Sequence, residues 1–386
     1  MKKKILIVSD SLRIGGIQTS LKNFIKTLPK EKFDITLFLF NEEGLENNLI
    51  DSNVKIKLGS KLLRVVSCSS EYAKKKGKLF YIVRKLYALL CKIFTSNVMY
   101  NLVFTFEKKL KGYDVVLSYS NNISNKSVYF GYNLFSIKKV EALEKISYIH
   151  IDYNKIHSKY IDSEYKKFNQ IWLVSKFTKE TFLKYNPSLE YKCKVIYNFI
   201  DIEKLNNIKK NPYKNNKFHI VTTGRLDENK SQIDAIEICK KLKNDKLDFD
   251  WYLLGDGPDR TKLQKLIKEN NLSDNLYLCG NVDNVNEYLA YSNLFVSLSK
   301  SESYGLAIVE SLLLNCVTIS RNIDVISEII ENGKNGIYCE LDEMYSYIKK
   351  LIINKAFYNK YKKNTKANYD YSKNLDNVIE ALNGGM

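Results

Sequence analysis

The chain has 386 residues, 45% of them hydrophobic, which is enough to bury the cores of two domains. Its net charge of +18 lies in the first half: residues 1–200 hold 35 Lys and Arg against 17 Asp and Glu, and residues 201–386 hold 26 of each. This imbalance favours an anionic partner. Seven scattered cysteines without paired spacing argue against a zinc site or a disulfide framework. With no export signal in the sequence, we expect a cytoplasmic protein.

Short runs rich in Ile and Val alternate with helical patterns, which predicts parallel sheets wound with helices. The first series of predicted strands comprises Ile5–Val8, Ile35–Phe40, Val54–Leu58, Val115–Tyr119, Ile146–His150 and Ile171–Val174. The second series comprises His219–Thr223, Trp251–Leu254, Leu276–Leu278, Leu294–Leu298, Val317–Ser320 and Ile337–Cys339. We therefore expect an α/β protein with two successive doubly wound domains.

The polar, Asn-rich segment Lys204–Lys217 separates the two series and is predicted to contain the linker. The expected organisation is a domain over residues 1–200, a second domain over residues 201–365, and a C-terminal helix over residues 366–386. This last helix is expected to pack back on the first domain.

The segment from Glu302 to Glu310 follows a predicted strand, and Gly305 opens an apolar helix within it. A helix N-terminus presents unbonded amides and partial positive charge, so the backbone of Tyr304, Gly305 and Leu306 can hold a phosphate or sugar hydroxyls. A pair of glutamates at this spacing is also common by chance. The segment is therefore informative only in combination with a second feature.

That second feature opens the second domain, where Gly224 ends a strand and is followed by Arg225 and Lys230. Glycine lets the backbone turn and a ligand approach, and two fixed cations can neutralise a diphosphate. A single basic loop residue is usually only solvated. Together with Glu302 and Glu310, these residues indicate a site for a nucleoside diphosphate.

The two segments resemble those of the retaining glycosyltransferases of the GT-B type known as family 4 or group 1. Members of this family carry a GR(L/F)xxxKG loop and an ExFGxxxxE segment. Further similarities are Asn198–Asp201 at the domain junction, Gly255–Pro258 after a strand, the Gly15–Gly16 pair, and His150 at a strand end. The resemblance implies two Rossmann-like doubly wound domains that face each other across a cleft.

The resemblance also implies roles for individual residues. Arg225 and Lys230 would bind the donor diphosphate, Glu310 the ribose, and Glu302 with the following amides the transferred sugar. Gly15 and Gly16 would close over the β-phosphate, His150 would lie by the sugar, and the base would lie near Asn281 and Val282.

Four positions depart from the family pattern: Ser231, Ser303, Tyr304 and Ala307 stand where Gly, Gly, Phe and Pro are usual. None of these changes removes a charged group, so we expect donor binding with an unassigned sugar preference. The Asp248–Asp250 pair has the D-x-D spacing of a metal site. It precedes a strand, at the end away from the expected crevice, so we interpret it as a solvated turn and expect no metal.

The expected activity is metal-independent transfer of a hexosyl unit with retention, from a UDP-linked donor to a cell-envelope polysaccharide, teichoic-acid or lipid-linked acceptor. No cofactor beyond the nucleotide-sugar is expected. One alternative is a sugar-nucleotide epimerase on the same fold. Another is a polyanion-binding protein, although no nucleic-acid-binding motif is present and we expect no nucleic acid partner.

Residues 61–111 concentrate the basic charge, with 12 Lys and Arg against only Glu71 and Glu107. A predicted helix there has one apolar face and one basic face. The apolar face comprises Leu79, Ile82, Val83, Leu86, Leu90 and Ile93, and the basic face Lys74, Lys78, Lys85 and Lys92. The apolar face either covers the first sheet or lies in an anionic membrane surface, at the inner face of the cell membrane.

Overall fold

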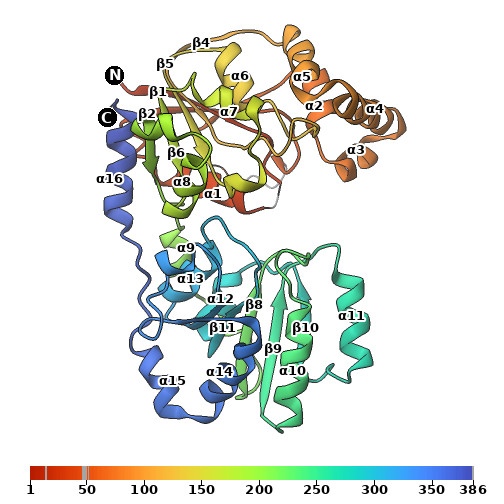
Figure 1. Ribbon diagram of the computed structural model, residues 1–386, viewed down its shortest axis with the longest axis vertical. Helices are drawn as coiled ribbons and strands as arrows, with labels where there is room; N and C mark the ends of the chain where they lie inside the picture. The colour runs from red at the N-terminus through yellow and green to blue at the C-terminus, as the bar shows by residue number, and fades with distance from the viewer. Residues whose placement is uncertain (14, 46–49, 51, 385–386) are drawn as a thin grey trace. The chain divides into compact units, whose positions relative to one another are not determined.

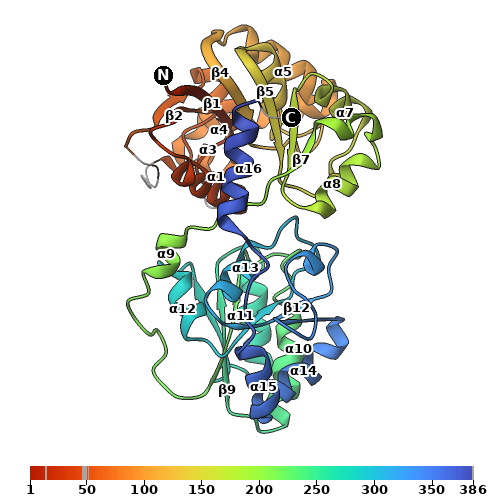
Figure 2. The ribbon, with the colours of Figure 1, turned by 90° about the vertical axis from the view of Figure 1, so that its left-hand side faces the viewer.

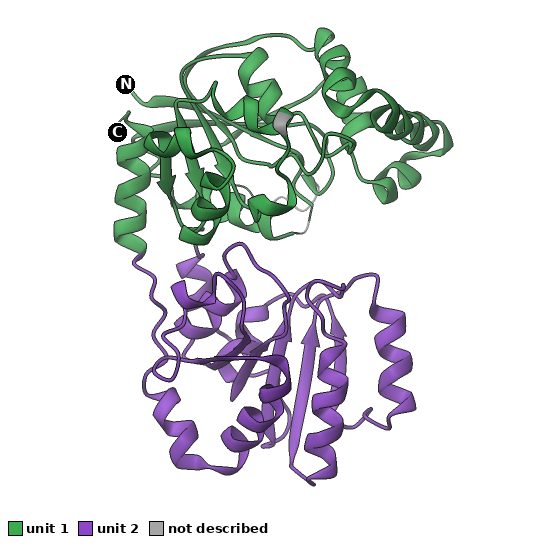
Figure 3. Ribbon diagram, in the orientation of Figure 1, with its two compact units in different colours: residues 1–199, 371–386 green, residues 200–370 purple. Residues whose placement is uncertain are grey.

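The computed structural model describes residues 1–13, 15–45, 50 and 52–384, and it divides into two compact units. The first comprises residues 1–199 and 371–386, and the second comprises residues 200–370 (Figure 3). The predicted boundary, between residues 200 and 201, lies one residue later than the observed one. The terminal helix α16 spans Tyr371–Leu382 and so begins five residues after the predicted start at residue 366.

The first unit is built on a seven-stranded parallel sheet in the order β3-β2-β1-β4-β5-β6-β7. In register, Ile5 lies beside Ile35 on one side and Val115 on the other. Because helices cover both faces of the sheet, central residues such as Ile5 are fully buried. The strands are β1 (Lys3–Ser9), β2 (Phe33–Leu39), β3 (Lys55–Leu58), β4 (Leu110–Ser118), β5 (Val140–Ile149), β6 (Gln170–Leu173) and β7 (Cys193–Val195).

The predicted strands of this unit are all present, with two differences. The prediction missed β7, which has three residues and a central lysine, Lys194, and so shows no apolar run. It also began β4 and β5 too late, because polar residues interrupt the first part of each strand, where most residues are half-buried or exposed. Apolar runs therefore mark the buried part of a strand and not its full length.

The helices of the first unit lie on both faces of its sheet and beyond one edge. They are α1 (Gly16–Thr27), α2 (Lys61–Ser67), α3 (Ser70–Lys76), α4 (Lys78–Phe94), α5 (Ser96–Thr105), α6 (Tyr132–Lys138), α7 (Lys159–Tyr165), α8 (Lys176–Leu183) and α16, with short 3₁₀ helices at Tyr153–Lys155 and Pro187–Lys192. Helices α2–α5 gather on the side of the unit away from α16 (Figure 1). Helix α16 runs along the unit (Figure 2), held by bonds from Asn374 to Tyr197 and from Gln170 to Ala381.

The second unit contains a six-stranded parallel sheet in the order β10-β9-β8-β11-β12-β13. Its strands match the predicted ones to within two residues: β8 (Phe218–Thr223), β9 (Phe249–Leu254), β10 (Leu276–Gly280), β11 (Leu294–Ser297), β12 (Val317–Arg321) and β13 (Ile337–Cys339). Its helices are α9 (Ile202–Asn206), α10 (Asp234–Asn244), α11 (Arg260–Glu269), α12 (Val285–Tyr291), α13 (Leu306–Leu313), α14 (Leu341–Ile353) and α15 (Lys355–Lys362), with a 3₁₀ helix at Ile326–Glu328.

The predicted linker, Lys204–Lys217, instead belongs to the second unit. It begins within α9, and further along Tyr213 is buried and donates a hydrogen bond to the carbonyl of Tyr288 at 2.9 Å. The amide of Asn215 donates to Asp250 at 2.8 Å. Most of its polar side chains are exposed, as in a linker, but Tyr213 and Asn215 bond to the second unit and hold the segment against it.

Candidate active site

Two glycines bring neighbouring loops of the second unit into close contact. Gly224 follows β8 with φ of +139°, and Gly255 follows β9 with φ of +131°. A Cβ atom on Gly255 would lie 2.1 Å from the carbonyl oxygen of Gly224, closer than any side chain tolerates. Since β8 and β9 are parallel neighbours, this approach forms part of the edge where ligands bind in doubly wound sheets.

The loop after β8 presents the two predicted cations in different surroundings. The Arg225 side chain is 70% exposed, and its Nε lies 3.7 Å from a carboxylate oxygen of Asp227. Lys230 is less exposed, and its Nζ forms an ion pair with Glu302. Arg225 is thus available to a ligand. Lys230 is already paired with Glu302, so a ligand that binds Lys230 has to compete with this carboxylate.

The pairing of Lys230 with Glu302 joins the two segments singled out in the sequence. They lie side by side because β8 and β11 are adjacent strands. The contact is fixed by a backbone bond from Lys300 to Asn229 at 2.8 Å, and the Asn229 amide donates to Ser301 at 3.0 Å. The structure therefore brings Gly224, Lys230 and Glu302 together.

Helix α13 begins at the predicted place, directly after Gly305. Gly305 has φ of +83°, and a Cβ there would lie 3.1 Å from Ile308 and 3.3 Å from Ile329. No side chain caps the helix. The amides of Leu306 and Ala307 have no acceptor within the helix, so its N-terminus has donors and partial positive charge for an anion.

Glu310 lies in α13, one turn beyond its N-terminus. Burial raises the pKa of its carboxyl group to about 7, while Lys204 of α9 opposes the shift. Glu310 therefore titrates near neutral pH. It is a strong hydrogen-bond acceptor only when ionised.

This pKa makes nucleotide affinity depend on pH if Glu310 accepts hydrogen bonds from ribose. We expect UDP affinity to fall about tenfold between about pH 8 and about pH 6, because the carboxylate becomes protonated over that range. The Glu310→Gln variant is the control, since the phosphates of UDP titrate equally in both proteins. Calorimetry over the range measures the difference, and parallel pH profiles for the two proteins would remove the ribose role.

Asn281 and Val282 follow β10, the outermost strand of the sheet on this side. Gly280 precedes them with φ of +70°, and its carbonyl accepts a bond from the amide of Gly255 at 2.7 Å. Asn281 and Val282 therefore lie at the C-terminal ends of the strands, as Gly224 does. No contact links either residue to Arg225, Lys230 or Glu302 in the described part of the chain, so their role near the base stays a prediction.

Gly15 and Gly16 lie at the start of α1, in the first unit. Gly15 is extended, and a Cβ there would lie 2.5 Å from Oε1 of Gln18. Gly16 is exposed, and a Cβ there would have no neighbour within 4 Å. The Gln18 oxygen is the end of a flexible side chain, so local packing does not by itself require glycine at position 15 or at position 16. A ligand-binding role stays the prediction for both.

His150 follows β5 and is only 7% exposed. Its ring packs against two tyrosine rings that also contact each other, with centroids 4.5 Å from Tyr119 and 4.0 Å from Tyr148. Neither ring nitrogen makes a well-formed hydrogen bond within the described residues, although the Asn198 side chain interacts with the ring. Burial lowers the pKa of His150 to about 3, so the ring is neutral at physiological pH and cannot supply a positive charge to a ligand.

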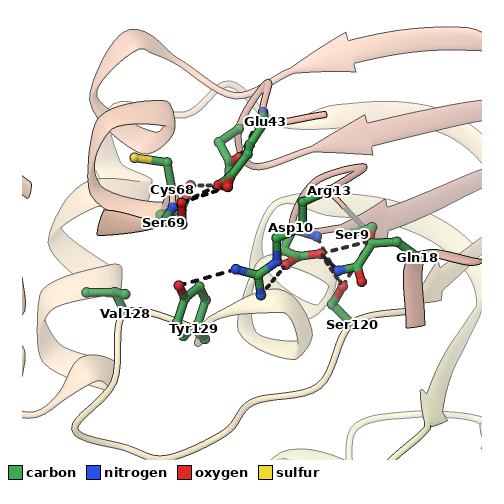
Figure 4. Close-up of polar contacts among 12 residues, drawn as sticks. Ser9, Asp10, Arg13, Gln18, Glu43, Cys68, Ser69, Ser120, Val128 and Tyr129 are labelled. Carbon is green, nitrogen blue, oxygen red and sulfur yellow. Dashed lines mark hydrogen bonds and ion pairs between the residues drawn. The ribbon is translucent and has the colours of Figure 1, made fainter. Parts of the chain in front are cut away.

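A polar cluster after β1 and β4 was missed in the sequence (Figure 4). Asp10 is buried and accepts hydrogen bonds from Ser120 at 3.1 Å and Gln18 at 3.0 Å. Arg13 lies 3.5 Å from Asp10 and stacks over the ring of Tyr129 at 4.8 Å. A charged residue directly after the first strand was the available signal. The cluster ties the loop that carries Gly15 to the loop after β4.

The Asp248–Asp250 pair lies at the start of β9, at the edge opposite Gly255. Asp250 is buried and pairs with Lys217 at 3.2 Å, whereas Asp248 is exposed. No group of three or more potential metal ligands occurs within the described ranges. The interpretation of the pair as a solvated turn fits Asp248 but is wrong for Asp250, whose buried carboxylate belongs to β9 and pairs with Lys217.

Residues 203–368 match the family of glycosyl transferases group 1. The second unit is a glycosyl transferases group 1 domain. Among relatives, an uncharacterized glycosyltransferase of Methanocaldococcus jannaschii is 31% identical over 195 residues, covering 48% of this chain and 46% of its own length. An N-acetylgalactosaminyltransferase of Campylobacter jejuni that acts on a diphospho-undecaprenol-linked sugar is 26% identical over 279 residues, covering 70% and 75%. The chain thus spans about half the length of the first relative.

Among solved structures, Anabaena HepE in complex with UDP and glucose aligns with 99% of this chain and 100% of its own, with a TM-score of 0.70 at 16% identity. This likeness confirms the GT-B fold predicted from the sequence. Within the glycosyl transferases group 1 domain, Ser231 occupies the usual glycine position with φ of +52°. Its hydroxyl donates to Asp234 at 2.9 Å, which helps to hold a conformation that glycine adopts freely.

Proposed function

We propose that the chain is a retaining, metal-independent glycosyltransferase that moves a hexosyl unit from a UDP-linked donor to a cell-envelope polysaccharide, teichoic-acid or lipid-linked acceptor. The observation that carries this proposal is the convergence of Lys230, Glu302 and the uncapped N-terminus of α13 at one sheet edge. Cations and amides around an anion suit a departing diphosphate.

The proposed roles follow from charge and position. Arg225 and Lys230 bind the diphosphate, the amides of α13 add partial positive charge, and Glu310 accepts from ribose. Glu302 accepts from hydroxyls of the sugar once the diphosphate has engaged Lys230. UDP as the nucleotide is supported by HepE, whose structure contains UDP and glucose.

The proposed reaction breaks the bond between the anomeric carbon and the β-phosphate oxygen and forms one to the acceptor oxygen on the same face. The departing phosphate oxygen takes the acceptor's proton, so no separate general base is required. Arg225 and Lys230 stabilise the charge that develops on the diphosphate. The neutral ring of His150 can accept or donate a hydrogen bond but does not act as a cationic acid.

A lipid-linked or polymeric envelope acceptor is supported by two observations. The Campylobacter relative is named for a diphospho-undecaprenol-linked acceptor. The excess positive charge of this chain lies in its first half, which suits an anionic polymer or a membrane surface. We propose that the protein acts at the inner face of the cell membrane.

The direct test is to incubate the protein with a panel of nucleotide-sugars and envelope acceptors and to measure transfer by mass spectrometry. We expect UDP release that depends on an acceptor, an unchanged rate in EDTA, and a product that keeps the donor's anomeric configuration by proton NMR. Loss of activity in EDTA with recovery in manganese would contradict metal independence, and an inverted product would contradict retention. Release of UDP without an acceptor, together with a sugar that has an inverted stereocentre, would favour the epimerase alternative.

A further inference from the structure

Helix α4 presents its most apolar face to solvent. Five large side chains that recur every three or four residues are between 53% and 76% exposed: Leu79, Ile82, Leu86, Leu89 and Ile93. A surface helix normally turns such a stripe toward the core. The stripe differs from the predicted apolar face, because it includes Leu89, whereas Val83 and Leu90 are half-buried. The four residues that the two share are exposed, which contradicts the alternative that this face covers the first sheet.

The face of α4 that does turn inward is the more polar one. Tyr87 and Cys91 are its buried residues, and Tyr87 packs edge-on against Tyr100 of α5 with ring centroids 5.6 Å apart. Arg84 lies on the same side and donates to the carbonyl of Cys68 at 3.1 Å. These contacts hold the helix in place with its apolar stripe outward.

Helix α5 and the residue after it extend the exposed apolar area. Val98, Leu102 and Phe106 recur every four residues and are exposed, while Tyr100, Val103 and Phe104 face the core. We call the exposed apolar side chains of the two helices the α4–α5 surface: Leu79, Ile82, Leu86, Leu89, Ile93, Phe94, Val98, Leu102 and Phe106. A soluble monomer rarely leaves so many large apolar side chains exposed together without a partner.

A row of lysines borders this surface. Lys78, Lys85 and Lys92 recur every seven residues, which places them on one side of α4 beside the apolar stripe, and all are exposed. Lys74, predicted to share this face, lies in α3 instead, because Gly77 with φ of +128° separates the two helices. Lysines in this position can extend toward anionic groups while the apolar side chains point into lipid.

Within residues 1–13, 15–45, 50 and 52–384, no acidic side chain forms an ion pair with Lys78, Lys85 or Lys92. Residues 61–111 contain two acids, and Glu107 is buried, accepting bonds from the amide of Ser60 at 3.1 and 3.2 Å. The other, Glu71, lies in the first turn of α3. The surface therefore combines an apolar stripe with unopposed positive charge.

We infer that the α4–α5 surface docks on an anionic lipid bilayer, with the apolar stripe in the headgroup layer and the lysines among the phosphates. No helix in the described part of the chain is long and apolar enough to cross a membrane, so docking is in the plane of the surface. The charge argues against a second copy, whose lysine rows would repel these, and favours anionic lipid. The inference goes beyond glycosyl transfer, because it concerns a surface outside the donor site.

The expected affinity follows from the two contributions. Each lysine near an anionic surface accounts for about a fivefold change in partitioning, so changing three of them weakens binding roughly a hundredfold. Removing two apolar side chains weakens it at least about tenfold. Attachment is expected to be reversible and to weaken as salt rises, because ions screen the lysines but not the apolar stripe.

The test is co-sedimentation of the full chain with vesicles of phosphatidylglycerol and phosphatidylcholine, compared with phosphatidylcholine alone. The charge variant changes Lys78, Lys85 and Lys92 to Gln, and its control changes the exposed lysines of α11: Lys262, Lys265 and Lys268. The apolar variant is Leu86→Gln with Ile93→Gln, and its control is Leu143→Gln with Ile353→Gln, also highly exposed. Because every changed residue is exposed, the variants should fold.

We expect binding to the anionic vesicles alone, with loss in both variants and retention in both controls. Equal binding by the charge variant and its control, or no binding by the wild type, would overturn the inference. Light scattering tests whether a second copy of the chain occupies the surface instead. If the wild type is a dimer and the Leu86→Gln, Ile93→Gln variant is a monomer, the surface is a dimer interface. Vesicle binding is measured without a donor, and UDP-sugar binding is measured without vesicles. The failure of membrane docking can therefore be distinguished from the failure of the proposed glycosyl transfer.

Discussion

Lys230→Ala is expected to lower turnover about a hundredfold or more, because it removes a fixed cation from the departing diphosphate. It also leaves the Glu302 carboxylate without its partner, next to the phosphates, which adds repulsion between like charges. UDP affinity should therefore fall as well. Steady-state kinetics and UDP calorimetry measure the two effects.

The control is Lys300→Ala, which removes another lysine of the same two loops, one that pairs with the exposed Glu228. It should keep near-normal turnover. The double variant Lys230→Ala, Glu302→Gln should recover part of the UDP affinity without recovering turnover, since the repulsion is gone but the cation is still missing. Normal turnover in Lys230→Ala would remove the diphosphate assignment.

Arg225→Ala should lower turnover with no change in melting temperature, because its side chain is 70% exposed.

Gly255→Ala is expected to cause the largest loss of stability among single glycine changes in the second unit. The new Cβ would lie 2.1 Å from the Gly224 oxygen, and the residue would have to keep a φ of +131°. The neighbour is backbone and cannot rotate away, so the loops after β8 and β9 must separate, and the site with them. We expect a cost of at least about 3 kcal/mol in the free energy of unfolding, together with loss of UDP binding.

Gly333→Ala is the matched control, because Gly333 also has a positive φ of +81° but a Cβ there would meet no atom within 4 Å. It should cost only the strain of the left-handed conformation, about 1–2 kcal/mol. Urea unfolding followed by circular dichroism compares the two variants. Equal midpoints would show that the close approach of the two loops does not matter to the fold.

The strands could be predicted because buried parallel strands require continuous apolar runs. The missed strand β7 has three residues, and its sequence carries no such run. The charged residues of the loop after β8 and of the Glu302 segment could be predicted as well, since their positions after strand ends follow from the alternation of elements.

The contacts of those residues could not be predicted. Lys230 and Glu302 are 72 positions apart, and their pairing depends on the adjacency of β8 and β11, which apolar runs do not encode. Likewise, the periodicity of α4 identifies an apolar face but not the direction in which it points. That direction depends on the contacts of Tyr87 and Arg84 with other helices.

The ion pair between Lys230 and Glu302 has a consequence for product inhibition under the proposed roles. A diphosphate that engages Lys230 competes with Glu302 for the ammonium group, so the carboxylate gains from a new partner. An intact donor supplies hydroxyl groups for that carboxylate, whereas free UDP leaves it facing the phosphates. The leaving nucleotide should therefore bind more weakly than the donor, and the enzyme should keep turning over as UDP accumulates.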